Sequence, residues 1–495
     1  MNQRNGVHIA ESPTLFISAG EASGEHYGAL LIHALRAQLA TKGQTGRFFG
    51  MGGERMAAAG CDCIVRSEDV AVMGFTEVLL HLPRIYREFR RIKRALRERR
   101  PDVAVLIDFP GFHLKLAAAI HKLGIPVVYF VSPQLWAWKQ HRIHQIHQSV
   151  DRMLVIFPFE QPFYRERGVL AEYVGHPLAD LPQPTVSRSQ LAVANGLDPD
   201  RTWLGLLPGS RIKEISANLP EMLAAAVQLD ARSRERARLH SDEHDLAERV
   251  STEHDSGRKD SERQDSTEQA NAATPAHRQS GQLSFLLPLA PTLTPAQRQR
   301  TQQIIDLHAP GLDVHLIEDA RAALFHARAS IVASGTATIE AALIGNPFVV
   351  VYRVSPLTHA IAKRIVKVPH VAMVNLIANK RLIPELIQSE FTAARIVNEL
   401  EPLLPDGPQR STLMKELASL RALLKSPSTS ASTSALIPAL IPASTPASSA
   451  AQIPSAIPTQ SDASPTAIER VAAETLRMIK WAEDQAGRKP DCSAQ

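Results

Sequence analysis

Two acidic residues that follow predicted strands are the strongest candidates for acid–base chemistry. Asp108 directly follows the apolar run 103–107, and Glu21 lies in the segment 18–25 (SAGEASGE), which follows the run 14–18. The carboxyl ends of parallel strands meet at one edge of a sheet, where α/β proteins bind ligands. A partly buried carboxyl group there has a raised pKa and can accept a proton from a substrate hydroxyl. We therefore expect Asp108 to be a general base, with Glu21 as a second catalytic carboxylate; helix capping by Asp108 is the alternative.

Small residues beside Glu21 favour a bound polar ligand. Gly20, Ser23 and Gly24 lie where a strand turns into a helix, so that backbone amides can approach a ligand closely. Their spacing differs from the dinucleotide-binding Gly-x-Gly-x-x-Gly pattern, and no Walker lysine follows. We expect all three to bind substrate; a tight turn with no ligand is the alternative. His113, on the helix after Asp108, is either a second base or a polar surface residue.

The second half of the chain has two further turns of this kind, with a cation and hydroxyl groups in place of the acids. Arg211 ends the segment 204–211 (LGLLPGSR), and Ser334-Gly335-Thr336 follows a later predicted strand. Helix-start amides and a bidentate arginine bind phosphate groups. Glu340, about one helical turn further on, can accept hydrogen bonds from ribose hydroxyls. Taken singly, Arg211 could be an ordinary surface arginine, and the segment 334–340 could be an ordinary helix start. Together they predict a site for a nucleoside diphosphate.

No metal or cofactor site is predicted. The cysteines are Cys61, Cys63 and Cys492, and no second cysteine or histidine pair completes a zinc site with the first two. We therefore expect amides and Arg211, rather than a divalent cation, to stabilise the charge on a departing diphosphate.

The elements that would position these residues form two tandem series. Short β-branched runs alternate with amphipathic helical stretches, which is the pattern of parallel α/β layers. We expect an α/β fold with two Rossmann-like domains, residues 1–185 and 190–405, facing a central cleft, and a further helix at 406–425. The predicted strands are residues 14–18, 47–49, 103–107, 127–131 and 153–156 in the first half, and 203–207, 284–287, 313–317, 330–333 and 348–352 in the second.

Two low-complexity insertions interrupt this pattern. Residues 231–282 are mostly charged and polar and bury too little apolar surface to fold, so we expect a disordered or loosely helical insertion. Residues 426–466 form a Ser/Ala/Pro-rich linker, because its prolines exclude a continuous helix or central strand. Residues 467–485 then form a helix whose apolar face needs a partner surface, on this chain or on a neighbour.

The segment 73–100 indicates where in the cell the protein acts. Arginines gather between His81 and Arg100 on a helix with a single apolar stripe, downstream of the largely apolar segment 73–80. This combination favours an anionic membrane surface, with the apolar segment accepting acyl chains. A surface helix that packs its stripe on the sheet is the alternative. The membrane-facing side chains would be Met73, Phe75, Val78, Leu79, Arg84, Arg87 and Arg91.

Other partners and destinations are disfavoured. The 55 basic and 50 acidic side chains give a net charge of only +5, and no RNA-binding motif accompanies the arginines, so we expect no nucleic acid. We find neither a signal-peptide core nor a run of 18 apolar residues. We expect a cytoplasmic protein with peripheral membrane contact.

As an ordered set, the motifs resemble those of the lipid-A-disaccharide synthase family, inverting glycosyltransferases of Gram-negative lipid A biosynthesis. The resemblance covers nearly the whole chain outside the two insertions. The segments that carry it are 18–25 (SAGEASGE), 50–53 (GMGG), 73–78 (MGFTEV), 108–112 (DFPGF), 131–138 (VSPQLWAW), 174–177 (VGHP), 207–211 (LPGSR), 334–340 (SGTATIE) and 374–377 (VNLI).

The resemblance implies a GT-B fold and transfer of 2,3-diacylglucosamine from UDP to the 6-hydroxyl of 2,3-diacylglucosamine 1-phosphate (lipid X), giving a β-1,6 disaccharide and UDP. Asp108 matches the family's candidate base, and Arg211, Glu340 and Asn375 match positions associated with nucleotide-sugar or phosphate binding. The family also implies contact with the inner membrane and a homodimer paired through the C-terminal helices. The chain departs from the family pattern at His113, where the family has Asn, and at Glu25, where Asp is usual.

Two other functions compete with this interpretation. A UDP-N-acetylglucosamine 2-epimerase, or another GT-B enzyme with a soluble UDP-sugar, would share the fold, but the arginine-rich helix and apolar segment argue against a soluble substrate. A non-catalytic nucleotide-sugar-binding protein at the membrane surface would bind UDP-sugar without releasing UDP. Activity that depends on the substrate's acyl chains would distinguish the synthase from an enzyme with a soluble substrate. Release of UDP would distinguish either enzyme from the binding protein.

Overall fold

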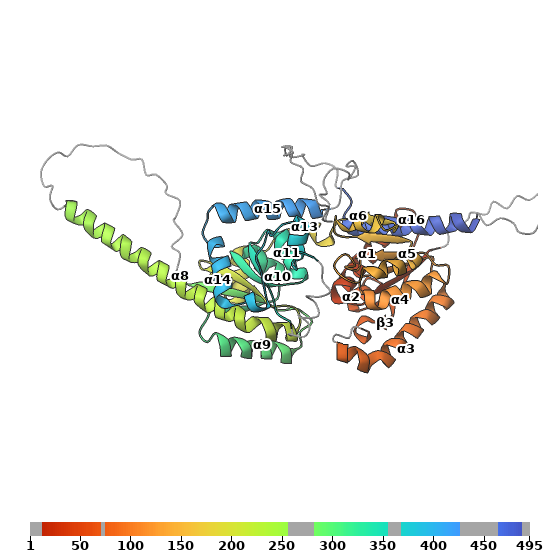
Figure 1. Cartoon of the computed structure of the whole chain (residues 1–495), viewed down its shortest axis with the longest axis horizontal. Coiled ribbons are helices and arrows are strands. Elements are labelled where there is room, and N and C mark those ends of the chain that lie inside the picture. The colour runs from red at the N-terminus through yellow and green to blue at the C-terminus, as the bar shows by residue number, and fades with distance from the viewer. Residues whose placement is uncertain (1–11, 71–74, 256–281, 355–367, 426–463, 488–495) are drawn as a thin grey trace, which may run out of the picture. The chain divides into compact units, whose positions relative to one another are not determined.

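Parallel strands with helices between them build both halves of this chain (Figure 1). The computed structural model describes residues 12–70, 75–255, 282–354, 368–425 and 464–487. The described residues divide into two units. Unit 1 holds the chain up to Leu181 and the residues from Ala422 onward, and unit 2 holds the described residues between Pro182 and Arg421.

Unit 1 contains a seven-stranded parallel sheet with the order β3-β2-β1-β4-β5-β6-β7. Strands β4 and β5 are buried along their whole length, as expected for central strands covered on both faces. The elements are β1 (Thr14–Ala19), α1 (Ala22–Ala40), β2 (Arg47–Gly52), α2 (Glu54–Ala58), β3 (Cys61–Arg66), α3 (Phe75–Arg99), β4 (Val103–Ile107), α4 (Pro110–His121), β5 (Val127–Phe130), α5 (Ile143–Ser149), β6 (Arg152–Val155), α6 (Glu160–Arg165) and β7 (Ala171–Tyr173).

Unit 2 contains a six-stranded parallel sheet with the order β10-β9-β8-β11-β12-β13. The predicted α/β class with two Rossmann-like domains is therefore confirmed. The elements are α7 (Arg188–Asn195), β8 (Thr202–Leu207), α8 (Ile212–Asp255), β9 (Leu283–Pro288), α9 (Pro295–His308), β10 (Val314–Ile317), α10 (Ala320–His326), β11 (Ala329–Ala333), α11 (Thr336–Ile344), β12 (Phe348–Tyr352), α13 (Met373–Ala378), β13 (Glu385–Ile387), α14 (Ala393–Leu400) and α15 (Pro408–Leu424).

The last helix, α16 (Ala467–Gly487), packs on unit 1 of its own chain. It contacts α1, β4 and β5, and its apolar face, which includes Val471 and Ala472, is buried there. A buried carboxylate, Glu474, pairs with Arg152 at the start of β6 at 2.7 Å. The partner surface that the amphipathic pattern requires is therefore supplied within the chain. The linker 426–463 before it lies outside the described residues.

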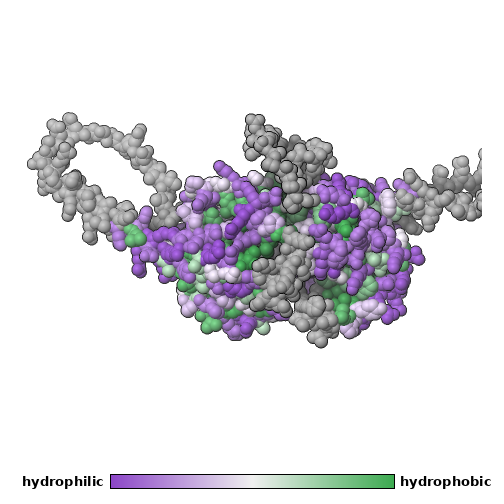
Figure 2. Space-filling model, viewed as in Figure 1, coloured by the Kyte–Doolittle hydropathy of each residue, from purple (hydrophilic) through white to green (hydrophobic). Residues whose placement is uncertain are grey.

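Helix α8 runs further than the composition of the chain predicts. Residues 231–255, expected to belong to a disordered or loosely helical insertion, continue α8 without a break. This stretch lacks glycine and proline and is rich in helix-forming Ala, Arg and Glu. Ion pairs from Arg232 and Arg236 to Glu401 hold its first turns against the unit. Figure 2 shows the described part of this extension as largely hydrophilic surface. Residues 256–281 lie outside the described residues.

Candidate active site

Each sheet reverses its strand order at one place, and predicted site residues follow the strands there. In unit 1 the reversal lies between β1 and β4, which lead into residues 20–25 and 108–113. In unit 2 it lies between β8 and β11, which lead into residues 208–211 and 334–336. Open α/β sheets bind ligands outside the carboxyl ends of their strands at such a switch point. The topology therefore gathers most of the predicted residues into one set per unit.

Asp108 has the properties of a general base. Burial, and then the neighbouring Glu21 carboxylate, raise the pKa of Asp108 to about 6, although a hydrogen bond from the Phe109 amide opposes the shift. Helix α4 begins at Pro110, with Phe109 at its N-cap position and no side-chain cap, so the capping alternative for Asp108 is wrong. A carboxylate with this pKa is ionised at neutral pH and is a stronger base than an exposed aspartate.

Close packing joins the two segments at the unit 1 switch point. A side chain on Gly20 would collide with the Phe109 ring, so only glycine fits there. Glu25 accepts a hydrogen bond from the Arg55 amide at 2.8 Å, which caps α2, and a Cβ atom on Gly53 would lie 2.6 Å from its carboxylate. Glu25 thus ties α1 to the turn after β2. In the predicted substrate-binding group, Ser23 is exposed and Gly24 is buried.

His113 is fully buried, so the surface alternative for this residue is wrong. Its ring lies 2.8 Å from the Ser18 hydroxyl and 2.7 Å from the backbone oxygen of Asp108. Burial lowers the pKa of His113 to about 4, so the ring is neutral at physiological pH. Transfer of a substrate proton to this ring would break one of these two contacts.

The unit 2 switch point presents a cation and an open helix start. Arg211 is exposed, and its guanidinium pairs with Glu214 at 3.1 Å. Glu214 also accepts a hydrogen bond from the Ser210 amide at 3.0 Å, so it occupies the start of α8. Helix α11 differs, because Gly335 at its N-cap position provides no side-chain cap. Gly335 and Thr336 are exposed, and the α11 start can therefore receive an anion.

Two other predicted binding residues are engaged within the chain. Glu340 is partly buried and lies 3.7 Å from Arg321, and burial raises the pKa of Glu340. Asn375, in α13, is fully buried. Its amide group bonds the backbone of Ile383 in both directions and the carboxylate of Glu385. Asn375 thus holds the loop before β13, and any effect on a nucleotide would pass through that loop.

Sequence reasoning missed two buried groups beside the predicted residues. Glu160, after β6, accepts hydrogen bonds from Ser132 at 2.7 Å and from the Trp136 indole at 3.1 Å, and burial raises its pKa to about 7. It therefore holds the segment that follows β5. Tyr129, inside β5, donates its hydroxyl proton to the backbone oxygen of Asp108 at 2.7 Å. Glu160 could have been found from the sequence, because it is an acid that follows a predicted strand. Nothing in the sequence around Tyr129 indicated its role.

The predicted membrane-facing group is only partly described. Met73 lies outside the described residues, and the side chains of Phe75, Val78 and Leu79 are among those left undescribed at the start of α3. The apolar stripe of α3 packs on the unit 1 core, and Arg84, Arg87 and Arg91 are exposed. Among the described residues, no helix is long and apolar enough to cross a membrane.

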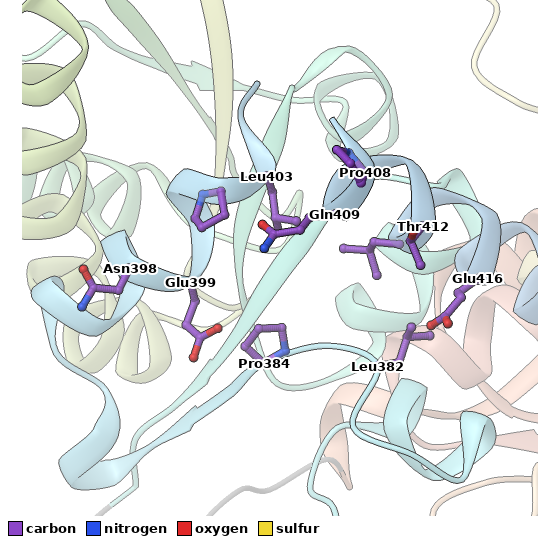
Figure 3. Close-up of a pocket in the computed structure, with 11 residues that line it drawn as sticks. Leu382, Pro384, Asn398, Glu399, Leu403, Pro408, Gln409, Thr412 and Glu416 are labelled. Atoms are coloured by element: carbon purple, nitrogen blue, oxygen red, sulfur yellow. The ribbon is translucent and has the colours of Figure 1, made fainter. Parts of the chain in front are cut away.

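A groove of about 510 Å³ in unit 2 lies away from these residues (Figure 3). It is lined by the loop before β13, by α14 and by α15, and it contains Pro384, Leu403 and Glu416. The loop residues precede β13, so the groove lies at the amino end of that strand, opposite the edge where the predicted residues gather. In the described part of the chain, no cluster of three or more His, Cys, Asp or Glu side chains could hold a metal ion.

Comparison with known proteins gives consistent matches. The family model described as lipid-A-disaccharide synthetase matches residues 15–248 and 234–437. A lipid-A-disaccharide synthase of Acidobacterium capsulatum is 52% identical over 430 residues, which cover 85% of this chain and 94% of that protein. That of Koribacter versatilis is 45% identical over 415 residues, 84% of this chain and 94% of that protein.

Similarity to solved structures is weaker. A putative UDP-N-acetylglucosamine 2-epimerase from Listeria monocytogenes has a TM-score of 0.48 and 11% identity, over 83% of this chain and 91% of that one. The calicheamicin glycosyltransferase CalG4 has a TM-score of 0.45 and 16% identity, over 84% of this chain and 94% of that chain.

Proposed function

This chain belongs to the lipid-A-disaccharide synthase family, and from that premise we propose which of its residues carry the reaction. The enzyme is a glycosyltransferase of lipid A biosynthesis. It condenses UDP-2,3-diacylglucosamine with 2,3-diacylglucosamine 1-phosphate to give a β-1,6-linked disaccharide 1-phosphate and UDP, with inversion at the anomeric carbon.

Asp108 is the general base of this proposal. Its carboxylate accepts the proton of the acceptor 6-hydroxyl, the oxygen attacks the anomeric carbon in line, and the bond from that carbon to the UDP oxygen breaks. The observation that carries the assignment is the position of Asp108 at the unit 1 switch point, with a pKa raised to about 6 by burial and by Glu21. Glu21 keeps the base strong and, with Gly20, Ser23 and Gly24, binds the acceptor.

The UDP group binds at the unit 2 switch point in this proposal. Arg211 and the start of α11 at Ser334-Gly335-Thr336 hold the diphosphate, since a guanidinium and the amides of a helix start without a side-chain cap complement its charge. The Ser334 amide itself is bonded to the Val351 oxygen, so the hydroxyl of Ser334 is its available donor. The ion pair with Glu214 uses one guanidinium nitrogen of Arg211, and the other N–H donors can bind the phosphate. Glu340 accepts from the ribose hydroxyls, and Asn375 shapes the neighbouring loop. The charge on departing UDP is stabilised by these groups, and we expect turnover to need no added divalent cation.

The replacement Asp108→Asn tests the assignment. It keeps the shape of the side chain but removes the proton acceptor, so kcat should fall by roughly 10²- to 10⁴-fold while binding of UDP is unchanged. Product mass and released UDP would be measured with both acylated substrates in detergent, with chelator present. The matched control is Asp62→Asn, an exposed carboxylate on β3 that should keep wild-type turnover.

The same assay separates the competing functions. A disaccharide phosphate formed with chelator present supports transfer without an obligatory metal. Release of UDP from a UDP-sugar without acyl chains would favour an enzyme with a soluble substrate. Wild-type turnover by Asp108→Asn would remove Asp108 from the mechanism.

Location and assembly complete the proposal. We place the enzyme in the cytoplasm, peripherally on the anionic face of the inner membrane through α3 and the apolar segment 73–80, because the arginines of α3 are exposed. A homodimer would pair through the C-terminal helices. Because the apolar face of α16 is buried on unit 1, that pairing would use the exposed side of α16, where Trp481 lies. Sedimentation of the Trp481→Ala variant measures this contribution.

A further inference from the structure

We infer that Tyr129, His113 and Ser18 form a positioning network that fixes the backbone carbonyl of Asp108 and, through it, the catalytic carboxylate. The inference rests on the proposed function, in which Asp108 is the general base. All three side chains are fully buried, so they act through Asp108 and do not touch a substrate.

The backbone at Asp108 needs such support. Asp108 has a φ of 51° and Phe109 a φ of 52°, so two successive non-glycine residues adopt the left-handed conformation. This conformation is unfavourable for an L-residue with a side chain, and two such residues in succession persist only where surrounding contacts enforce it. Two such residues in a row at the end of β4 imply that specific contacts hold them.

Two side chains bond the same backbone oxygen. The Tyr129 hydroxyl donates to the Asp108 carbonyl at 2.7 Å, and His113 Nδ1 lies 2.7 Å from the same atom. A carbonyl oxygen has two lone pairs, so both acceptor positions are filled. The amide of Asp108 donates to the Phe130 oxygen of β5 at 2.9 Å. Both backbone polar groups of Asp108 are thus fixed, and rotation out of the left-handed region would break these bonds.

The proton on the His113 ring can be assigned from its partners. The Asp108 carbonyl can only accept, so Nδ1 carries the proton. The ring is neutral, because burial lowers the pKa of His113 to about 4, so Nε2 is an acceptor and the Ser18 hydroxyl donates to it at 2.8 Å. Ser18 is in β1, directly before the segment that contains Glu21. The network therefore connects the two strands that flank the unit 1 switch point.

Tyr129 can keep its donor role throughout an activity assay. Burial raises the pKa of Tyr129 well above its ordinary value, with a further contribution from the Asp108 carboxylate. The hydroxyl therefore stays protonated over the pH range in which Asp108 titrates. Replacement by phenylalanine removes the donor and little else, because the ring remains packed among Phe112, His113 and the other residues of the core.

The test compares Tyr129→Phe, His113→Leu and the double variant with the wild-type enzyme, because neither Phe nor Leu has a side-chain donor. Each single variant leaves one donor on the carbonyl, so kcat should fall about five- to tenfold. The double variant removes both specific donors, and its kcat should fall by more than the product of the single effects, roughly 100-fold or beyond. The KM for UDP-sugar should be unchanged. Release of the loop would expose the carboxylate to water, so the acid limb of kcat/KM should move to lower pH.

Tyr173→Phe is the matched control. The Tyr173 hydroxyl also donates from a sheet strand of unit 1 to a backbone oxygen, that of Leu423 at 2.9 Å, but it lies in β7. This variant should lower Tm about as much as Tyr129→Phe and leave kcat and its pH dependence unchanged.

The outcomes separate the network from the proposed base. If Tyr129→Phe and the double variant lose Tm but keep wild-type kcat and pH dependence, while Asp108→Asn is inactive, the network is structural only and the inference is wrong. If Asp108→Asn remains active, the proposed base is wrong, and a crystal structure of the double variant decides the inference. A φ of Asp108 that stays positive without both donors would overturn it, and relaxation to a negative φ would support it.

Discussion

At the scale of single residues, the negative charge of Glu21 affects the protonation of Asp108 at the unit 1 switch point. Burial is the main reason that the pKa of Asp108 rises to about 6, and the charge of Glu21 adds to it. Two like charges in a partly buried site favour the protonated form of one of them. The proposed base is therefore mostly protonated below about pH 6, and its strength depends on the charge of the neighbouring Glu21.

The replacement Glu21→Gln tests this dependence. Without the negative neighbour the pKa of Asp108 should fall, so the acid limb of the kcat/KM profile should move from about 6 toward lower pH. Turnover at pH 8 should drop less than tenfold, because Asp108 is ionised in both enzymes there. A matched Glu54→Gln change, in α2, should leave the profile in place. An unshifted acid limb in Glu21→Gln would mean that the limb reports another group.

Sequence patterns predicted Asp108 and Glu21 for a physical reason, and they missed Tyr129 for another. An acid after a buried strand lies at the carboxyl edge of a sheet in any α/β protein, so its position follows from the strand alone. Tyr129 lies inside the apolar strand β5, where an aromatic residue reads as core. Its role depends on the left-handed conformation of Asp108, which aspartate tolerates better than most residues but adopts too rarely for the sequence to predict it.

At the scale of elements, the central strands of the two described sheets were predictable, but of their edge strands only β10 was. All ten strands expected from apolar runs are present, within a few residues of their predicted ends. The strands β3, β7 and β13, which were missed, each lie at an edge of a sheet. Edge strands are short or partly polar because they are less buried and pair on one side only, so their sequences lack a continuous apolar run.

The outer face of α3 provides a prediction about membrane binding. Arg84, Arg87 and Arg91 are exposed while the apolar stripe is buried, so these guanidinium groups can meet a lipid surface, together with the exposed side chains of Leu82 and Tyr86. Changing the three arginines to glutamine should weaken binding to vesicles of anionic lipid by roughly 10- to 100-fold at low salt, and much less at high salt. Sedimentation with vesicles measures the loss.

The control for α3 removes equal charge from unit 2. Arg238, Arg300 and Arg381 are exposed in unit 2, and their change to glutamine alters the net charge identically. Equal losses in the two triple variants would show that net charge, rather than the α3 face, governs vesicle binding.

At the scale of the whole molecule, the segment between Asp230 of α8 and Leu283 of β9, which we call the excursion, begins and ends at neighbouring points of unit 2. The amide of Leu283, at the start of β9, donates to the buried carboxylate of Asp230 in α8 at 3.0 Å. The buried face of α8 ends at about this level, and residues 231–240 are exposed or half-buried. We therefore expect the chain between Arg236 and Leu283 to tolerate changes of length without movement of the sheet, which explains how a strong family resemblance persists around an insertion.

Replacing residues 238–281 with a flexible loop of about eight Gly and Ser residues should leave the enzyme intact. The cut keeps Arg232 and Arg236, and with them the ion pairs to Glu401 that hold α8 against the unit. We expect kcat within about twofold of wild type and a Tm that is unchanged or slightly higher, because a shorter loop loses less entropy on folding. Asp230→Asn, which weakens the bond at the base of the excursion, should instead lower Tm. A shortened enzyme that is stable but inactive would show that the excursion takes part in binding the acylated substrates, since the base and the diphosphate site would both still be in place.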